Sequence, residues 1–212
     1  RTSWALNGNT ITMPGKFQPG RTYELAYRPE KLPVSGLGMA AFRDTAAWVK
    51  RAPDALARAQ YTIAFGSSQS GRFLRTFLYY GFNSDERGNQ VFDGVWAHIA
   101  GGARLSLNER GATPTALSMW QATAFPFANA AQRDPITGRT EGLLDNERAR
   151  ERQPKIFYTN TSVEYWGGGR AAALVHTTPD GSADLPVPEN TRIYFLTGAQ
   201  HGPARFPTKA VN

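Results

Sequence analysis

The sequence predicts an α/β fold, in which a mostly parallel sheet is flanked by helices. Three observations support this: short apolar runs of β composition recur along the chain, amphipathic helical patterns separate them, and turn residues bound both. Parallel strands cannot be joined by a tight turn, so each connection needs a crossover, which is usually a helix. With 212 residues and 41% hydrophobic content, the chain is long enough for a substantial core, and we expect residues 1–212 to form one domain.

The expected strands are short segments rich in β-branched and aromatic residues. They cover residues 22–28, 61–65, 94–102, 155–161 and 191–198. The sequence YTIAF, residues 61–65, is almost entirely apolar, which is typical of a strand buried on both faces. Residues 1–20 are rich in Gly, Asn, Pro and Thr and predict a loop or a short hairpin.

The expected helices alternate with these strands. Residues 38–51 carry an apolar stripe that includes Met39 and Phe42, and the sequence RAP ends it. A second helical pattern, RFLRTFLYYG, follows residue 71 and closes at Gly81. Residues 170–176 are also helical in composition, and residues 146–155 alternate in charge, as a solvated helix face does.

Residues 103–154 fit none of these strands and predict an insertion that acts as a lid or cap over the sheet. Trp120, Phe125 and Phe127 lie in it and are candidates for contacting a substrate. The alternative for this stretch is an ordinary pair of packing helices.

Composition excludes several classes of protein. The net charge of +7 comes from scattered Lys and Arg residues, which argues against a nucleic-acid partner. No apolar run is long enough for a membrane-spanning helix, so we expect a soluble protein. The absence of cysteine removes disulfides, thiolate metal ligands and thiol nucleophiles, and leaves the compartment open. The chain begins with Arg1, so we expect either a fragment or a protein from which an upstream segment, such as an export signal, has been removed.

The sequence FGSSQSG, residues 65–71, joins an expected strand to an expected helix, where a nucleophilic serine can protrude from a sharp turn. Such a turn requires small residues two positions before and two after the nucleophile. Ser68 satisfies this, with Gly66 before it and Ser70 after it. Ser67 and Ser70 do not, because Phe65 precedes one and Arg72 follows the other. The alternative is a serine-rich turn that caps the next helix.

A serine hydroxyl needs a neighbouring base, normally a histidine oriented by a carboxylate. His201 follows the last strand in a loop with two glycines and is the expected base. His98 is explained as a packed strand residue, and His176 as the end of a helix.

The acid is expected after the strand that precedes the last one, where Glu164 lies. Asp180 and Asp184 are the alternatives, although an Asp-Gly sequence is more typical of a turn. Glu164 itself could instead form a surface ion pair with Arg170.

A second glycine pattern, Gly36-x-Gly38-x-x-Ala41, matches the fingerprint of dinucleotide-binding proteins, and Asp54 lies near the spacing of the ribose-binding acid. That motif must follow a strand directly, whereas PEKLPVS precedes it here. We therefore expect no cofactor and no metal, and interpret the glycines as allowing close packing at a helix start.

With Ser68, Glu164 and His201 placed, the sequence resembles the α/β-hydrolase superfamily. More narrowly, it resembles the C-terminal half of bacterial proteins described as alpha/beta hydrolase domain proteins. The segments that carry this resemblance are GRTYELAYR, GLGMAAFRD, FGSSQSGRFLR, FDGVWAHIAGGAR, FPFANAAQRDPITGRTEGLLD, PKIFYTNTSVEYWG and TGAQHGP.

The resemblance implies a serine hydrolase that cleaves small-molecule carboxylic esters, with Ser68 as nucleophile, His201 as base and Glu164 as acid. The backbone N–H of Gln69 is the expected oxyanion donor. The superfamily's early strands, and the loop with the second oxyanion donor, would precede this chain. Peptidase and acyltransferase chemistry use the same triad. The rival from another class is a non-catalytic fragment that binds a hydrophobic ligand or partner around residues 120–127. The sequence does not address the oligomeric state.

Overall fold

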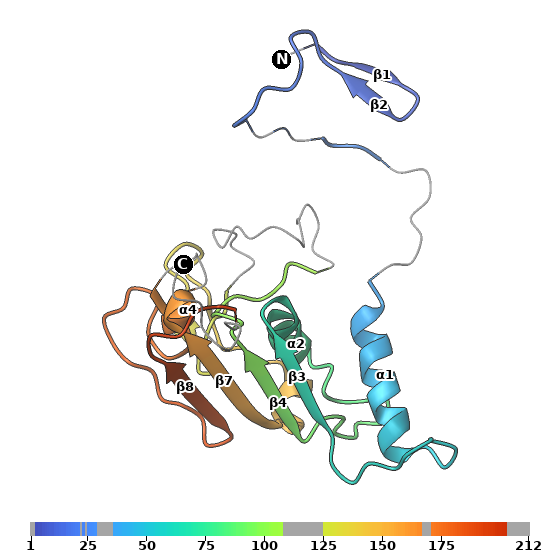
Figure 1. Cartoon of the computed structure of the whole chain (residues 1–212), viewed down its shortest axis with the longest axis vertical. Coiled ribbons are helices and arrows are strands. Elements are labelled where there is room, and N and C mark those ends of the chain that lie inside the picture. The colour runs from blue at the N-terminus through green and yellow to red at the C-terminus, as the bar shows by residue number, and fades with distance from the viewer. Residues whose placement is uncertain are drawn as a thin grey trace, which may run out of the picture. The chain divides into compact units, whose positions relative to one another are not determined.

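The computed structural model describes residues 3–21, 23, 25–28, 36–107, 125–166 and 171–202 (Figure 1). The chain divides into two compact units, Arg1–Ser35 and Gly36–Asn212, which are described separately here. That residues 1–212 form one domain stays a prediction.

The first unit contains a short hairpin. Strand β1 (Ala5–Asn7) pairs antiparallel with β2 (Thr10–Thr12), and Gly8, with φ of 57°, begins the turn between them. The hairpin predicted for this region is therefore confirmed. The strand predicted for residues 22–28 is wrong, because the described residues there, 23 and 25–28, belong to no strand. Strand composition is not enough, since a strand also needs a neighbour for its backbone hydrogen bonds.

The second unit is built on a parallel sheet of four strands among the described residues. Its strands are β3 (Ile63–Ser67), β4 (Gly94–His98), β7 (Lys155–Thr161) and β8 (Thr191–Leu196), in the spatial order β3-β4-β7-β8 (Figure 1). Every neighbouring pair is parallel, as the alternating pattern predicts. The carboxyl ends of all four strands therefore meet at one edge of the sheet.

Helices flank these strands along the chain, with the first before β3 and the others between consecutive strands of the sheet. They are α1 (Gly38–Arg51), α2 (Gln69–Tyr79), α3 (Glu147–Glu151), α4 (Ser162–Trp166) and the 3₁₀ helix η2 (Ala172–Val175). Helix α1 has the predicted bounds. No helix in the described ranges is long and apolar enough to cross a membrane. The predicted lid, residues 103–154, contains α3 and a small antiparallel pair, β5 (Gln132–Arg133) and β6 (Thr140–Glu141), and its role as a lid stays a prediction.

The two faces of the sheet differ sharply. One face forms the core, where Ala64, Val95, Ala97, Ile156 and Tyr158 are at most 4% exposed. On the other face, side chains from the same strands are exposed. These are Ile63, Phe65, Trp96, Phe157 and Tyr194.

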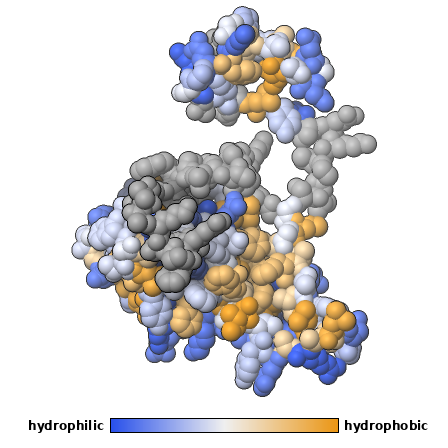
Figure 2. All heavy atoms as spheres, in the orientation of Figure 1, coloured by the Kyte–Doolittle hydropathy of each residue, from blue (hydrophilic) through white to orange (hydrophobic). Residues whose placement is uncertain are grey.

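The prediction that residues 61–65 form a strand buried on both faces is therefore wrong, because Ile63 is 71% and Phe65 58% exposed. Side chains of a strand alternate between the two faces of its sheet, so only every second residue of β3 enters the core. Figure 2 shows apolar residues reaching the surface in the region of α1 and β3.

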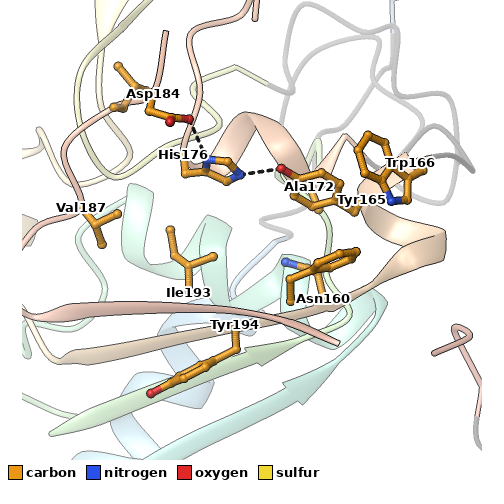
Figure 3. A pocket seen from close by; sticks show the side chains of 11 residues that line it. Asn160, Tyr165, Trp166, Ala172, His176, Asp184, Val187, Ile193 and Tyr194 are labelled. Carbon is orange, nitrogen blue, oxygen red and sulfur yellow. Dashed lines mark hydrogen bonds and ion pairs between the residues drawn. The ribbon is translucent and has the colours of Figure 1, made fainter. Parts of the chain in front are cut away.

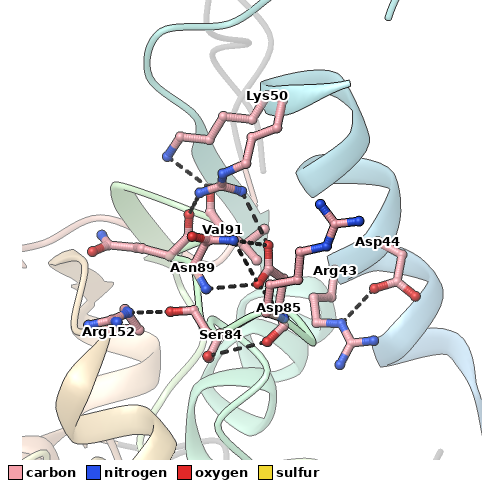
Figure 4. A network of polar contacts seen from close by, with 12 residues as sticks. Arg43, Asp44, Lys50, Ser84, Asp85, Asn89, Val91 and Arg152 are labelled. Carbon is pink, nitrogen blue, oxygen red and sulfur yellow. Dashed lines mark hydrogen bonds and ion pairs between the residues drawn. The ribbon is translucent and has the colours of Figure 1, made fainter. Parts of the chain in front are cut away.

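Polar contacts tie α1 to the segment between α2 and β4 (Figure 4). Lys50 Nζ lies 2.6 Å from Asp93 Oδ2, and Arg51 lies 3.6 Å from Asp85. Asp93 also accepts the backbone N–H of Thr62. These contacts hold the beginnings of β3 and β4 against α1.

Candidate active site

Ser68 lies in the sharp turn between β3 and α2. Its φ of 57° places it in the left-handed region, which is uncommon for a residue with a Cβ and costs free energy. The Ser68 N–H donates to the carbonyl of His98 at 2.9 Å, and the Ser68 carbonyl accepts from Arg72 N in α2. The strand ladder and the helix thus hold the strained residue from both sides.

Glycines beside Ser68 make this turn sterically possible. A Cβ on Gly66 would lie 2.5 Å from the carbonyl oxygen of Ser70, and one on Gly71 would lie 2.8 Å from the Cβ of Ala100. Since the first obstacle is backbone, it cannot move aside without opening the turn. This close approach of the Ser70 carbonyl explains why the turn needs a small residue two positions before Ser68.

The structure brings together Ser68, His201 and Glu164, which are far apart in the sequence. Ser68 Oγ lies 3.0 Å from His201 Nε2, and His201 Nδ1 lies 2.5 Å from Glu164 Oε1. The three residues follow β3, β8 and β7 respectively, so they meet at the carboxyl edge of the parallel sheet. This is a hydroxyl, an imidazole and a carboxylate linked in one hydrogen-bonded chain.

Glu164 is fully buried, with an exposed fraction of 0%. Burial raises the pKa of its carboxyl, but hydrogen bonds from the Thr161 hydroxyl and N–H and from His201 outweigh this and lower the pKa below its usual value. The group is therefore a carboxylate at neutral pH. A buried negative charge beside Nδ1 favours the tautomer that carries its proton there, which leaves Nε2 as an acceptor facing Ser68.

Gln69 begins α2, directly after Ser68. The first N–H groups of a helix have no acceptor within the helix, and they lie at its positive end. An oxyanion formed at Ser68 would therefore be next to a suitable donor. A cavity of about 600 Å³ adjoins this position, with walls that include Phe42, Phe65, Gln69, Phe73, Leu74 and Leu105.

The aromatic residues predicted to contact substrate are not all described. Trp120 lies outside the described residues. Phe125 is buried and Phe127 half-buried, and their rings meet edge to face at 6.0 Å. The carbonyl of Phe127 accepts from Arg75, a fully buried side chain that stacks 4.7 Å above the Tyr158 ring. These contacts fix the segment against the core, and contact of Phe125 and Phe127 with substrate stays a prediction.

The other histidines and carboxylates have partners of their own. His98 Nδ1 bonds Thr159 Oγ1 at 2.7 Å within the sheet, as a packed strand residue should. Asp180 accepts from Thr178 and Ser182 in a turn, as its sequence predicts. Asp184 lies 3.4 Å from His176, so neither aspartate reaches His201 in the structure.

Sequence reasoning missed three parts of the site. Thr161 holds Glu164 through both its N–H and its hydroxyl, and the signal was a threonine three residues before the acid at a strand end. The sequence carries no signal for the His98 carbonyl that accepts the Ser68 N–H, because every residue has a backbone carbonyl. Phe73 could have been found from its spacing, since it lies one helical turn after Gln69.

Within the described ranges, no group of three or more His, Asp or Glu side chains could hold a metal ion. Gly36 has φ of 81°, and Gly38 begins α1. The expectation of close packing is wrong for Gly38, because a Cβ there would meet nothing within 4 Å.

Comparison with known proteins identifies the family. The family model described as Alpha/beta hydrolase domain matches residues 7–211, which is nearly the whole chain. No curated protein and no solved structure matches the chain. The parallel sheet with flanking helices agrees with the family match. From its sheet, from the chain of contacts at its carboxyl edge and from this match, the protein belongs to the alpha/beta hydrolase domain family, and is a hydrolase in general terms.

Proposed function

We propose that this protein is a serine hydrolase that cleaves carboxylic esters through an acyl-enzyme. The observation that carries the proposal is the hydrogen-bonded chain from Ser68 Oγ through His201 to Glu164, with distances of 3.0 and 2.5 Å, ending in a turn that holds Ser68 at a φ of 57°. A serine used only to cap a helix needs neither the histidine nor the strained backbone.

In the proposed acylation step, His201 Nε2 takes the proton of Ser68 as Oγ attacks the ester carbonyl carbon. The carbonyl oxygen becomes an oxyanion beside the N–H of Gln69, and Glu164 stabilises the imidazolium. When the tetrahedral intermediate collapses, the bond to the alcohol breaks and His201 protonates the departing oxygen. A water molecule then attacks the acyl-enzyme by the same route, releasing the acid and restoring Ser68.

The cavity beside Gln69 supports an apolar acyl group as part of the substrate. With the oxyanion next to the Gln69 N–H, the acyl chain can lie against the walls that Phe42, Phe73 and Leu105 provide. The volume of about 600 Å³ is in the range of small-molecule sites. Because these walls are hydrocarbon, they favour an uncharged chain over a charged one.

The test is hydrolysis of p-nitrophenyl acetate together with labelling by a fluorophosphonate probe. Ser68→Ala should abolish both, while Ser67→Ala, a matched change at the neighbouring serine, should keep both.

Labelling of the Ser68→Ala variant at the rate of the unsubstituted protein would contradict the proposal. Absence of both activities in the unsubstituted protein would favour the rival, a module that binds a hydrophobic ligand or partner without catalysis.

A further inference from the structure

A second cavity, of about 510 Å³, lies between α4, η2 and β8 (Figure 3). Ser68, Gln69, Glu164 and His201 are not among its lining residues. Its walls are mostly apolar or aromatic and include Trp166, Ala172, Leu185, Val187, Ile193 and Phe195. Its volume falls within the range of sites that bind small molecules.

Asn160 supplies a polar group to this cavity. Its side chain is 3% exposed, and its Oδ1 accepts the backbone N–H of Gly101 at 3.0 Å. Because an N–H can only donate, the oxygen must face Gly101 and the amide nitrogen must face the other way. Figure 3 shows this nitrogen turned towards the side of the cavity where His176 and Ile193 lie.

The structure gives the Asn160 amide nitrogen no acceptor among the described residues, and this nitrogen is not one of the fully enclosed side-chain atoms, so it faces the open space of the cavity. Buried N–H groups in folded proteins nearly always have an acceptor. This donor can therefore pair with an oxygen acceptor of a ligand that takes the place of water in the cavity.

The polar side chains of Tyr165, His176 and Asp184 are engaged with one another. Tyr165 OH lies 2.9 Å from His176 Nε2, and His176 Nδ1 lies 3.4 Å from Asp184 Oδ1 (Figure 3). The Asp184 side chain is 86% exposed, which places its negative charge at the mouth. No Lys or Arg is among the lining residues that the structure describes. Among these described residues, an anionic ligand would therefore meet repulsion without a compensating cation, and a neutral ligand is favoured.

We propose that this cavity binds a neutral, apolar molecule that carries a carbonyl group. The carbonyl oxygen accepts a hydrogen bond from Asn160 Nδ2, and the hydrocarbon part packs against Ile193, Phe195 and Trp166. The proposal does not depend on the esterase reaction, because the two sites share no residue.

The experiment is ligand-observed NMR titration of the full chain carrying Ser68→Ala, so that a ketone cannot add to the serine. Three probes of similar size are compared: acetophenone, which is neutral with a carbonyl; ethylbenzene, which lacks the carbonyl; and benzoate, which is anionic. Acetophenone should bind about 3- to 10-fold more tightly than ethylbenzene, the usual contribution of one hydrogen bond, and more tightly than benzoate.

Two variants locate the site. Asn160→Asp keeps an acceptor for Gly101 but removes the donor, so it should eliminate the advantage of acetophenone over ethylbenzene. Val187→Trp, at a 47% exposed lining position, should fill the cavity and weaken both probes about 10-fold or more. Leu56→Trp, at a 96% exposed position that is not among the lining residues, is the matched control and should change nothing.

Equal binding of acetophenone and ethylbenzene to the starting protein would overturn the proposal, because it would show that no donor in the cavity selects a carbonyl group. So would binding of acetophenone that Val187→Trp leaves unchanged. Neither of these outcomes requires the Asn160 variant to fold.

Discussion

Two histidines of this protein each lie between a hydroxyl and a carboxylate, but in very different settings. His201 joins Ser68 at 3.0 Å to a fully buried Glu164 at 2.5 Å. His176 joins the hydroxyl of Tyr165 at 2.9 Å to Asp184 at 3.4 Å, whose side chain is 86% exposed.

If the proposed function holds, this difference means that connecting a hydroxyl, an imidazole and a carboxylate is not enough to make a nucleophile. A carboxylate in water is screened and free to move, so it orients an imidazole weakly. Ser68 also stands in a strained turn at a helix start, with an N–H donor beside it, whereas Tyr165 lies within α4. We therefore expect hydrolysis to depend on the chain through His201 and to be indifferent to the chain through His176.

The largest effect should come from the histidines. His201→Gln should lower hydrolysis of p-nitrophenyl acetate by about 10⁴-fold or more, as for loss of a base in other serine hydrolases. His176→Gln should stay within about threefold of the starting protein, because no reacting atom lies near it. The measurement is kcat/KM for each variant, and a large loss in the His176 variant would mean that the two chains are coupled.

Exchanging the two carboxylates for amides should give the next largest effect. Glu164→Gln should reduce kcat by about 10²- to 10⁴-fold, because the amide can hold the imidazole in the wrong tautomer. Asp184→Asn should leave kcat unchanged, since the exposed group is screened by water. Steady-state kinetics at one pH decide this, and equal losses in the two variants would contradict the comparison.

Adding a side chain within the turn that holds Ser68 should lower both the stability of the fold and the rate of hydrolysis. Gly66→Ala puts a Cβ 2.5 Å from the Ser70 carbonyl and should destabilise the fold by roughly 1–3 kcal/mol. Gly38→Ala, where nothing lies within 4 Å, is the control and should not destabilise. Urea denaturation measures both, and a Gly66→Ala variant of full stability and activity would show that the turn tolerates a side chain.

The smallest effect should come from removing a hydrogen bond that stabilises the Glu164 carboxylate. Thr161→Val removes the hydroxyl that donates to Glu164 and should cost about 1 kcal/mol at neutral pH. The native pKa of Glu164 is lowered, so the stability it contributes is present above the usual value of 4.5 and is lost as the pH falls through the native pKa. The difference in stability between Thr161→Val and the starting protein should therefore shrink as the pH falls below that usual value and through the lowered native pKa. If the difference in the free energy of unfolding between the two proteins stayed constant down to pH 2, this linkage would be excluded.

Much of the site could be anticipated from local patterns. The rule of small neighbours selected Ser68 among three serines, because the steric conflict at Gly66 involves residues only four apart in the sequence. The order of residues along the chain pointed to His201 and Glu164, because strand ends of a parallel sheet share one edge. The bounds of α1 and β7 also match those predicted, since both have clear periodicity or composition.

Other features could not be anticipated. Residues 61–65 are wholly consistent with a strand buried on two faces, yet half of that strand is exposed. The cavity near Asn160 joins side chains of β7, α4, η2 and β8, and no spacing in the sequence links them.

The sequence by itself determined most of the helices and the strands of the sheet, their parallel direction and the serine at the turn, because these depend on side-chain periodicity and on sterics between near neighbours. The tertiary structure alone decided which carboxylate is buried against which histidine, which face of the sheet is covered, and where an amide donor is left without an acceptor. These depend on distances between residues remote in the chain, which only the packing of the crossovers sets.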